Sequence, residues 1–211
     1  MADLTFVYGA MGAGKSTELI MRAYDFESES KKVFLIKPII DDKGSDTVMN
    51  RFGLERKVDY LVKPTENMIH IITSLRHRPD VIIIDEAQFL TADQVDQLFL
   101  ISKEFNIPVL AYGIRSDFKQ NPFSGSPRLF TIADNIKELE GKICNCGKKA
   151  TQNIRLYKGI PTFEGESVLI DKASDVNKKG KEVVYSYKSV CGDCYVRTRR
   201  KYSKTEDNKN W

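Results

Sequence analysis

The sequence has no hydrophobic stretch long enough to cross a membrane and no feature typical of a secretory signal. Its purely apolar runs are short, as at Val81–Ile84, whereas a helix that spans a bilayer needs about 20 apolar residues. The N-terminus has no basic region before its first apolar stretch, and Asp3 lies directly in front of that stretch. We therefore expect a cytoplasmic protein without a membrane partner.

Strong compositional bias is absent as well. Of the 211 residues, 41% are hydrophobic and 29% are charged, which is close to the averages of globular proteins. This composition excludes a disordered chain and a collagen-like repeat. The length lies between one minimal domain and two full ones, and it is sufficient to bury a core without disulfide bonds.

The first 140 residues and the remaining 71 differ in charge and in cysteine content. Residues 1–140 contain 17 Lys and Arg against 21 Asp and Glu, whereas residues 141–211 contain 16 against 8. All four cysteines lie in the second part. We therefore expect a nucleotide-binding domain over residues 1–140, a basic, cysteine-bearing lobe over 141–200, and a flexible polar tail over 201–211.

Short β-favouring runs alternate with helix-compatible segments in the first part. This alternation predicts an α/β fold in which helices cover both faces of a parallel sheet. The polar stretch 41–53 contains two glycines and has no periodicity, so we expect a mobile loop there. The expected strands are 4–8, 33–36, 81–84 and 107–112, and the expected helices are 15–29, 68–75 and 93–105.

A phosphate-binding loop is the most specific motif of the first part. The sequence between the first strand and the first helix matches G-x-x-x-x-G-K-[ST], in the structural context that this motif requires. Its main-chain N–H groups and the helix N-terminus would face phosphates, and Lys15 would bridge the β- and γ-phosphates of a nucleotide. The motif predicts nucleotide binding but not the reaction. Its residues are Gly9, Ala10, Met11, Gly12, Ala13, Gly14, Lys15 and Ser16.

Two carboxylates, Asp85 and Glu86, follow the apolar strand 81–84. The carboxyl ends of the strands in such a sheet face the ligand crevice. Asp85 is suited to hold Mg²⁺ together with the Ser16 hydroxyl, and Glu86 would accept a proton. The proton would come from water in an ATPase and from a substrate hydroxyl in a kinase.

The cysteines form two closely spaced pairs, Cys144 with Cys146 and Cys191 with Cys194. Four thiolates with few competing ligands favour one structural Zn²⁺ in a closed tetrahedral site. The alternatives are unliganded thiols or a redox-active dithiol at Cys191 and Cys194. A zinc site would hold together the two ends of the excursion 147–190.

Taken together, these motifs resemble the type II thymidine kinases, which are cytosolic thymidine kinase 1-like enzymes. The resemblance covers about residues 4–195. It rests on G-A-M-G-A-G-K-S-T-E-L at 9–19, I-D-E-A-Q-F at 84–89, G-I-R-S-D-F and N-P-F within 113–123, and Y-K-S-V-C at 187–191, together with the cysteine pairs. It implies transfer of the γ-phosphoryl group of ATP to the 5′-hydroxyl of thymidine, which gives dTMP and ADP.

The resemblance also implies roles for individual residues. Glu86 corresponds to the general base, Ser16 and Asp85 to the Mg²⁺ site, and Gln88 to the ATP site together with residues 9–16. Met11, Phe89 and Phe118 resemble residues of the base pocket, and 164–171 resembles the lasso loop that covers the nucleoside. Main-chain groups of this loop and one tyrosine would contact thymidine; they belong to Ser167, Val168, Leu169, Ile170, Asp171 and Tyr187.

The resemblance further implies a homotetramer, feedback inhibition by dTTP and a role in nucleoside salvage. A second reading remains open, because a basic zinc lobe beside a phosphate loop is also compatible with an ATPase that binds nucleic acid. The basic part has no recognisable nucleic-acid-binding motif, so we expect no nucleic acid partner. Its charge would then belong to a solvated or oligomer-facing surface.

Overall fold

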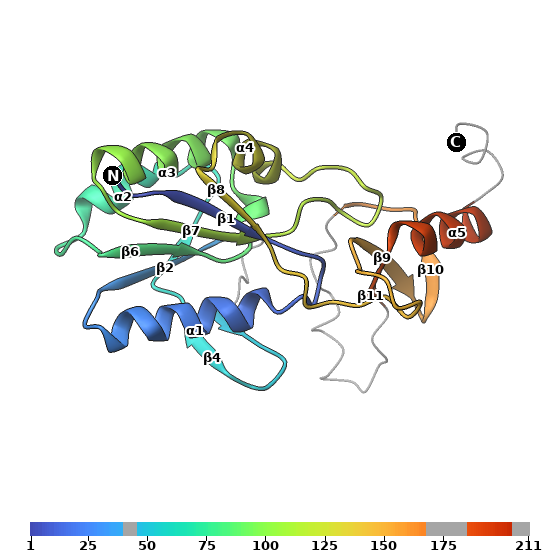
Figure 1. The fold of residues 1–211 in the computed structure, drawn as a ribbon. Coiled ribbons are helices and arrows are strands. Elements are labelled where there is room, and N and C mark those ends of the chain that lie inside the picture. The colour runs from blue at the N-terminus through green and yellow to red at the C-terminus, as the bar shows by residue number, and fades with distance from the viewer. Residues whose placement is uncertain (40–45, 168–184, 204–211) are drawn as a thin grey trace, which may run out of the picture. The chain divides into compact units, whose positions relative to one another are not determined.

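The computed structural model describes residues 1–39, 46–167 and 185–203. The chain forms two compact units, each with a sheet of its own (Figure 1). The first unit consists of residues 1–9, 14–115 and 122–139, and the second consists of 10–13, 116–121 and the chain from residue 140. Residues 10–13 of the phosphate loop thus pack with the cysteine-bearing part of the chain.

The first unit is built on a parallel sheet of six strands in the order β5-β2-β6-β7-β1-β8. Because every pair is parallel, the carboxyl ends of all six strands lie at the same edge. The strands are β1 (Leu4–Tyr8), β2 (Val33–Pro38), β5 (Tyr60–Val62), β6 (Val81–Ile84), β7 (Val109–Gly113) and β8 (Asn135–Glu138). This arrangement confirms the predicted α/β fold.

Helices cover both faces of this sheet (Figure 1). Successive side chains of a strand point to opposite faces, and in β6 Ile82 and Ile84 pack in one core while Val81 and Ile83 pack in the other. Helix α1 (Lys15–Ser28) packs in the core that contains Val81 and Ile83. The core that contains Ile82 and Ile84 includes residues of α2 (Met68–Ser74), α3 (Ala92–Glu104) and α4 (Gly125–Ile132).

The expectation of a loop over 41–53 was wrong for part of that stretch. Two short strands, β3 (Thr47–Met49) and β4 (Glu55–Lys57), form an antiparallel hairpin there. Val48 is buried against α1, and this packing stabilises a strand that is too short to show a periodic pattern. Residues 41–45 lie outside the described ranges.

The second unit contains an antiparallel sheet in the order β10-β9-β11 and one helix. Its small core combines Ile154, Val190 and Tyr195 with two of the cysteines. The helix continues through Lys201 and Tyr202, which the sequence had assigned to the tail. The elements are β9 (Gln152–Tyr157), β10 (Ile160–Thr162), β11 (Tyr185–Val190) and α5 (Gly192–Tyr202).

Candidate functional site

The phosphate loop leads directly into α1. Gly14, the residue before the helix, has φ +96°, a left-handed conformation that favours glycine, and an added Cβ would meet no atom within 4 Å. Its carbonyl accepts the N–H of Glu18 at 2.9 Å, so the helical hydrogen bonds begin at the end of the loop. Ser16 lies in the first turn. The N–H groups of this turn therefore lie beside the loop, and a helix N-terminus favours an anion.

Lys15 is the cation of this site. Its Nζ donates a hydrogen bond to the Gly9 carbonyl at 3.0 Å. Burial lowers the pKa of Lys15, and the negative charges of Glu86 and Asp85 oppose that shift. These interactions connect Lys15 with the acid pair, and an anionic phosphate placed here would also favour the charged form of the lysine.

Asp85 and Glu86 follow β6 at the carboxyl edge of the sheet. Asp85 is buried, and its N–H donates to the Ile36 carbonyl of β2 at 2.9 Å. Burial and then the charge of Glu86 raise the pKa of Asp85 to about 7, against the opposing effects of Lys37 and Lys15. A dication placed beside this buried carboxylate would stabilise its charged form.

Glu86 has φ 52° and ψ 38°, a left-handed conformation that costs energy in a residue other than glycine. Gln88, which lies in the 3₁₀ turn η1 (Ala87–Phe89), donates from Nε2 to Glu86 Oε2 at 2.5 Å. Gln88 Oε1 in turn accepts the N–H of Ile114 at 3.2 Å. The Gln88 amide thereby fixes one oxygen of Glu86. The place of Gln88 in the ATP site, which the resemblance implies, stays a prediction. Steric space for that amide depends on Gly113, where an added Cβ would lie 2.9 Å from Gln88 Oε1.

The residues expected around the base belong to both units. Phe89 in the first unit packs edge-on against Phe123, with ring centroids 5.3 Å apart. In the second unit, Phe118 is 1% exposed and Tyr187 on β11 is 36% exposed. Ser167 is exposed. The other four expected contacts, Val168 to Asp171, lie outside the described residues.

Sequence reasoning missed a pair of buried side chains, Asn153 on β9 and Ser189 on β11, which lie opposite each other. Asn153 Oδ1 accepts the N–H of Met11 at 3.0 Å, and the Ser189 hydroxyl lies 2.6 Å from the Met11 carbonyl oxygen and 3.0 Å from Asn153 Oδ1. Both main-chain groups of Met11 therefore have side-chain partners. The only sequence signal was the position of Ser189 two residues before Cys191.

Removing the Asn153 amide should weaken nucleotide binding, because the N–H of Met11 would lose its partner beside the phosphates. We expect Asn153→Ala to raise the Kd of ATP by roughly 3- to 30-fold, the equivalent of one lost hydrogen bond to a buried group. Equilibrium titration with a fluorescent ATP analogue measures this change. Thr151→Ala, two residues before Asn153 in the chain, is the control, and equal Kd values for both variants would contradict the assigned role.

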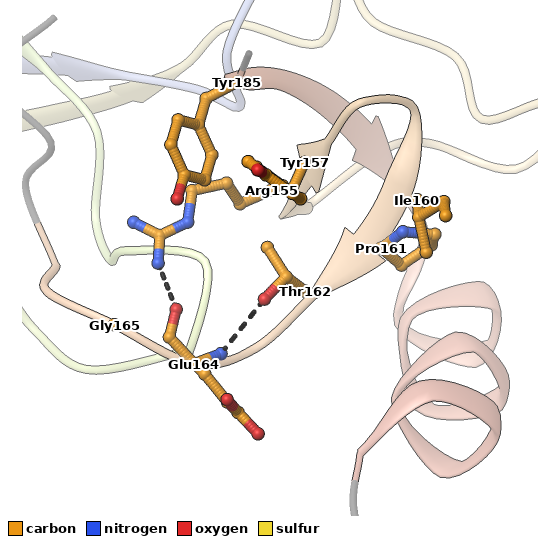
Figure 2. A pocket seen from close by; sticks show the side chains of 8 residues that line it. All are labelled: Arg155, Tyr157, Ile160, Pro161, Thr162, Glu164, Gly165 and Tyr185. Atoms are coloured by element: carbon orange, nitrogen blue, oxygen red, sulfur yellow. Dashed lines mark hydrogen bonds between the residues drawn. The ribbon is translucent and has the colours of Figure 1, made fainter. Parts of the chain in front are cut away.

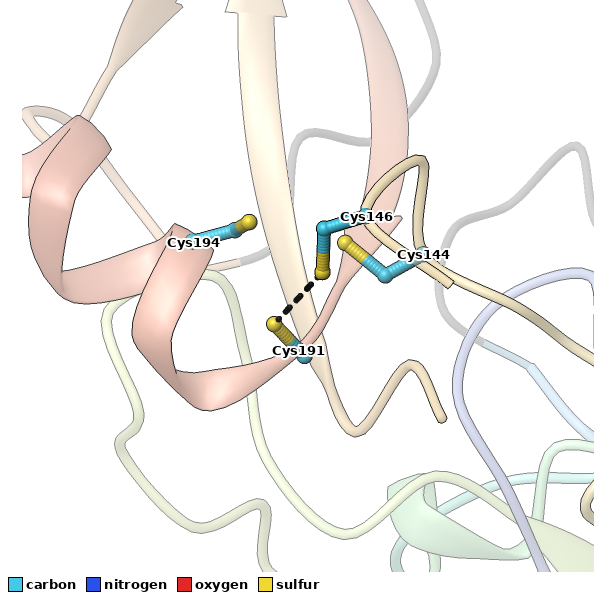
Figure 3. Close-up of side chains that lie close together, drawn as sticks. All are labelled: Cys144, Cys146, Cys191 and Cys194. Carbon is cyan, nitrogen blue, oxygen red and sulfur yellow. Dashed lines mark hydrogen bonds between the residues drawn. The ribbon is translucent and has the colours of Figure 1, made fainter. Parts of the chain in front are cut away.

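The four cysteines converge in the second unit (Figure 3). Their sulfur atoms all lie within 4.8 Å of one another, and Cys146 Sγ and Cys191 Sγ are 3.4 Å apart. The first pair lies in a tight turn closed by hydrogen bonds between residues 144 and 147–148, and Gly147 has φ +85° there. The second pair lies at the start of α5. The structure thus brings together residues 45 or more positions apart in the chain.

This cluster has the geometry and the chemistry of a tetrahedral metal site. Zinc–sulfur bonds of about 2.3 Å place thiolate sulfurs about 3.8 Å apart around one ion, close to the separations found here. Main-chain N–H groups of Cys146 and Cys191 lower the pKa of Cys144 to about 6, which favours the thiolate that binds a metal. All four cysteines are free of disulfide bonds. They could hold one metal ion.

Comparison with known proteins identifies the family. A sequence model described as thymidine kinase matches residues 2–195. A thymidine kinase of Coxiella burnetii is 42% identical over 172 residues, which cover 80% of this chain and 87% of the relative. A thymidine kinase of Chromobacterium violaceum is 35% identical over 196 residues, which cover 92% and 98% of the two chains. The phosphate loop, the acid pair and the cysteine cluster therefore belong to a member of the thymidine kinase family.

Proposed function

We propose that this protein transfers the γ-phosphoryl group of ATP to the 5′-hydroxyl of thymidine, forming dTMP and ADP. The observation that carries the proposal is the acid pair at the end of β6, whose charges act on the lysine of the phosphate loop. A phosphoryl transfer requires a cation on the phosphates, a ligand for Mg²⁺ and a proton acceptor. Lys15, Asp85 and Glu86 supply these three functions in a chain of the thymidine kinase family.

Each group has a separate task in this mechanism. Residues 9–16 bind the phosphates through main-chain N–H groups, and Lys15 neutralises charge on the β- and γ-phosphates. Ser16 and Asp85 would hold Mg²⁺, which supplies further charge neutralisation when it is bound. Glu86, oriented by Gln88, accepts the proton of the 5′-hydroxyl as the oxygen attacks phosphorus. We also propose that Gln88, which holds the Glu86 carboxylate, belongs to the ATP site.

For the nucleoside, we propose an aromatic and main-chain site. Met11, Phe89 and Phe118 would contact the flat faces of the pyrimidine, and the Tyr187 hydroxyl and main-chain groups of 167–171 would bind its polar edge or the deoxyribose. Readout by main-chain groups is selective, because a wrong base leaves buried amide groups unpaired.

We further propose that the metal of the four cysteines is a structural Zn²⁺, that the protein works in the cytoplasm as a homotetramer, and that dTTP inhibits it. No helix in the described ranges is long and apolar enough to span a membrane. The chemistry of four thiolates supports zinc. The homotetramer and inhibition by dTTP are proposed from the resemblance to type II thymidine kinases alone.

The proposal is tested by ADP release in a coupled assay with ATP, Mg²⁺ and a set of acceptors. We expect ADP release to rise at least tenfold with thymidine and to stay at its basal rate with single-stranded DNA, double-stranded DNA or RNA. Uridine and deoxycytidine serve as matched nucleoside controls. ADP release stimulated by a nucleic acid and not by thymidine would replace the kinase with an ATPase that binds nucleic acid.

A further inference from the structure

Arg155 on β9 is a buried cation, and the described part of the chain gives it no acidic partner. The residue is 1% exposed, and no carboxylate of the described residues forms an ion pair with it. Its Nε is buried, and none of the described residues forms a hydrogen bond with it. Burying a guanidinium without a counter-ion is costly. Packing alone does not account for it, because an apolar side chain would fill the same volume without that cost.

The guanidinium group instead binds two main-chain carbonyl groups. Figure 2 shows its hydrogen bond to that of Glu164. Nη1 donates to the Glu166 carbonyl at 2.7 Å, and Nη2 donates to the Glu164 carbonyl. Lys119 Nζ donates to the carbonyl between them, that of Gly165, at 2.9 Å. Two cations from distant parts of the sequence thus bind three successive carbonyl groups of one short segment, 164–166.

The same two cations contact Phe118. The Arg155 guanidinium carbon lies 3.7 Å from the centroid of the Phe118 ring, and Lys119 Nζ lies 5.7 Å from it. Close stacking of a desolvated guanidinium on an aromatic face is a favourable cation–π interaction. The hydroxyl of Tyr195 donates to the Phe118 carbonyl at 2.8 Å, so both the ring and the main chain of Phe118 are held.

Gly165 has the backbone conformation that this arrangement needs. Its φ is +94°, and a Cβ placed on it would lie 2.8 Å from Arg155 Nη2. The turn at Gly165 directs the carbonyls of residues 164 and 166 to one guanidinium. Arg155, Gly165 and Tyr185 are among the residues that line a cavity of about 410 Å³ (Figure 2).

We infer that Arg155 and Lys119 are positioning residues for the nucleoside: they hold the 164–166 main chain and the Phe118 ring in the arrangement that binds it. This inference rests on the proposed function, in which Phe118 and Ser167 contact thymidine. The hydrogen bonds and ring contacts of the two cations within the described residues join them to 164–166, Phe118 and Tyr185. Their loss should therefore weaken thymidine binding and leave ATP binding unchanged.

The decisive experiment measures KM for thymidine and KM for ATP separately in variants of the full-length protein. Arg155→Lys keeps the charge but cannot bind two carbonyls side by side, and Arg155→Met removes the charge. We expect a rise of at least tenfold in KM for thymidine in both, and a change below twofold in KM for ATP. Lys158→Met is the matched control, because Lys158 lies on the same hairpin over the Tyr157 ring, and it should change neither KM.

Chemical rescue separates positioning from general stability. Millimolar methylguanidinium should restore part of the thymidine affinity of Arg155→Ala and have no effect on the wild type. If thermal unfolding and metal content show that the Arg155 variants do not fold, the same two KM values are measured for Lys119→Met and Gly165→Ala. A rise in KM for thymidine without a rise in KM for ATP in these two variants supports the inference.

Two failures are distinguishable. A wild-type protein without thymidine-dependent ADP release would overturn the proposed function itself. An active wild type whose folded Arg155 or Lys119 variants keep a normal KM for thymidine, or whose two KM values rise equally, would overturn only the positioning role.

Discussion

Replacing Glu86 with glutamine is expected to lower kcat by roughly 10²- to 10⁴-fold, the usual contribution of a general base. Glutamine has nearly the same shape, but it cannot accept the proton of the 5′-hydroxyl. ATP and thymidine should still bind, because the phosphate loop and the base pocket are unchanged. Rapid-quench measurement of the chemical step, together with titration of both ligands, checks this expectation.

A matched control is Glu104→Gln, which makes the same change at an exposed residue at the end of α3. Its kcat should equal that of the wild type. A Glu86→Gln protein with nearly normal kcat would remove Glu86 from the mechanism. A protein that loses ATP binding instead would show that the charge of Glu86 acts on Lys15 and not on the acceptor hydroxyl.

Replacing Cys191 with serine should remove the metal and unfold the second unit. Cys191 is buried in a small core that consists partly of the cysteines themselves, so this unit has little apolar burial to replace the metal. We expect the zinc content to fall from about one ion per chain to nearly none. Elemental analysis and near-ultraviolet circular dichroism measure the two effects independently of activity.

Asp193→Asn is the control for this experiment. Asp193 lies between Cys191 and Cys194 and forms an exposed ion pair with Lys148, and such pairs contribute little to stability. It should keep both zinc and fold. If the wild type, purified without chelator, contained no zinc, the cysteines would be free thiols or a redox pair. If Cys191→Ser kept its metal, Cys191 would not be a required ligand.

The first unit could be predicted from the sequence because its signals are local. The loop and helix at 9–28 and the acid pair after Val81–Ile84 each lie within a few residues of a strand. The parallel sheet then follows from the alternation of elements. The hairpin that contains Val48 was missed, since one buried residue in a three-residue strand gives no periodicity.

The second unit was harder to predict because its strands bury polar side chains. β9 places Asn153 and Arg155 in the interior, so the apolar alternation that identifies a strand is absent there. The partners of these side chains, Met11 and Phe118, lie far away in the sequence. The hydrogen bonds from the Arg155 guanidinium group to the carbonyls of residues 164 and 166 could not be predicted either, because every residue has a carbonyl group and the sequence does not mark those that are bound. The spacing of the four cysteines was the one sequence signal for this part of the chain, and it predicted that they lie together at a metal site.

The most direct test of the central claim is ³¹P NMR of a reaction that contains the protein, ATP, Mg²⁺ and thymidine. Transfer to the 5′-hydroxyl predicts that the γ-phosphorus resonance of ATP is replaced, in equal amounts, by the resonances of ADP and of thymidine 5′-monophosphate. Release of inorganic phosphate with unmodified thymidine, or a phosphate on the 3′-oxygen, would contradict it.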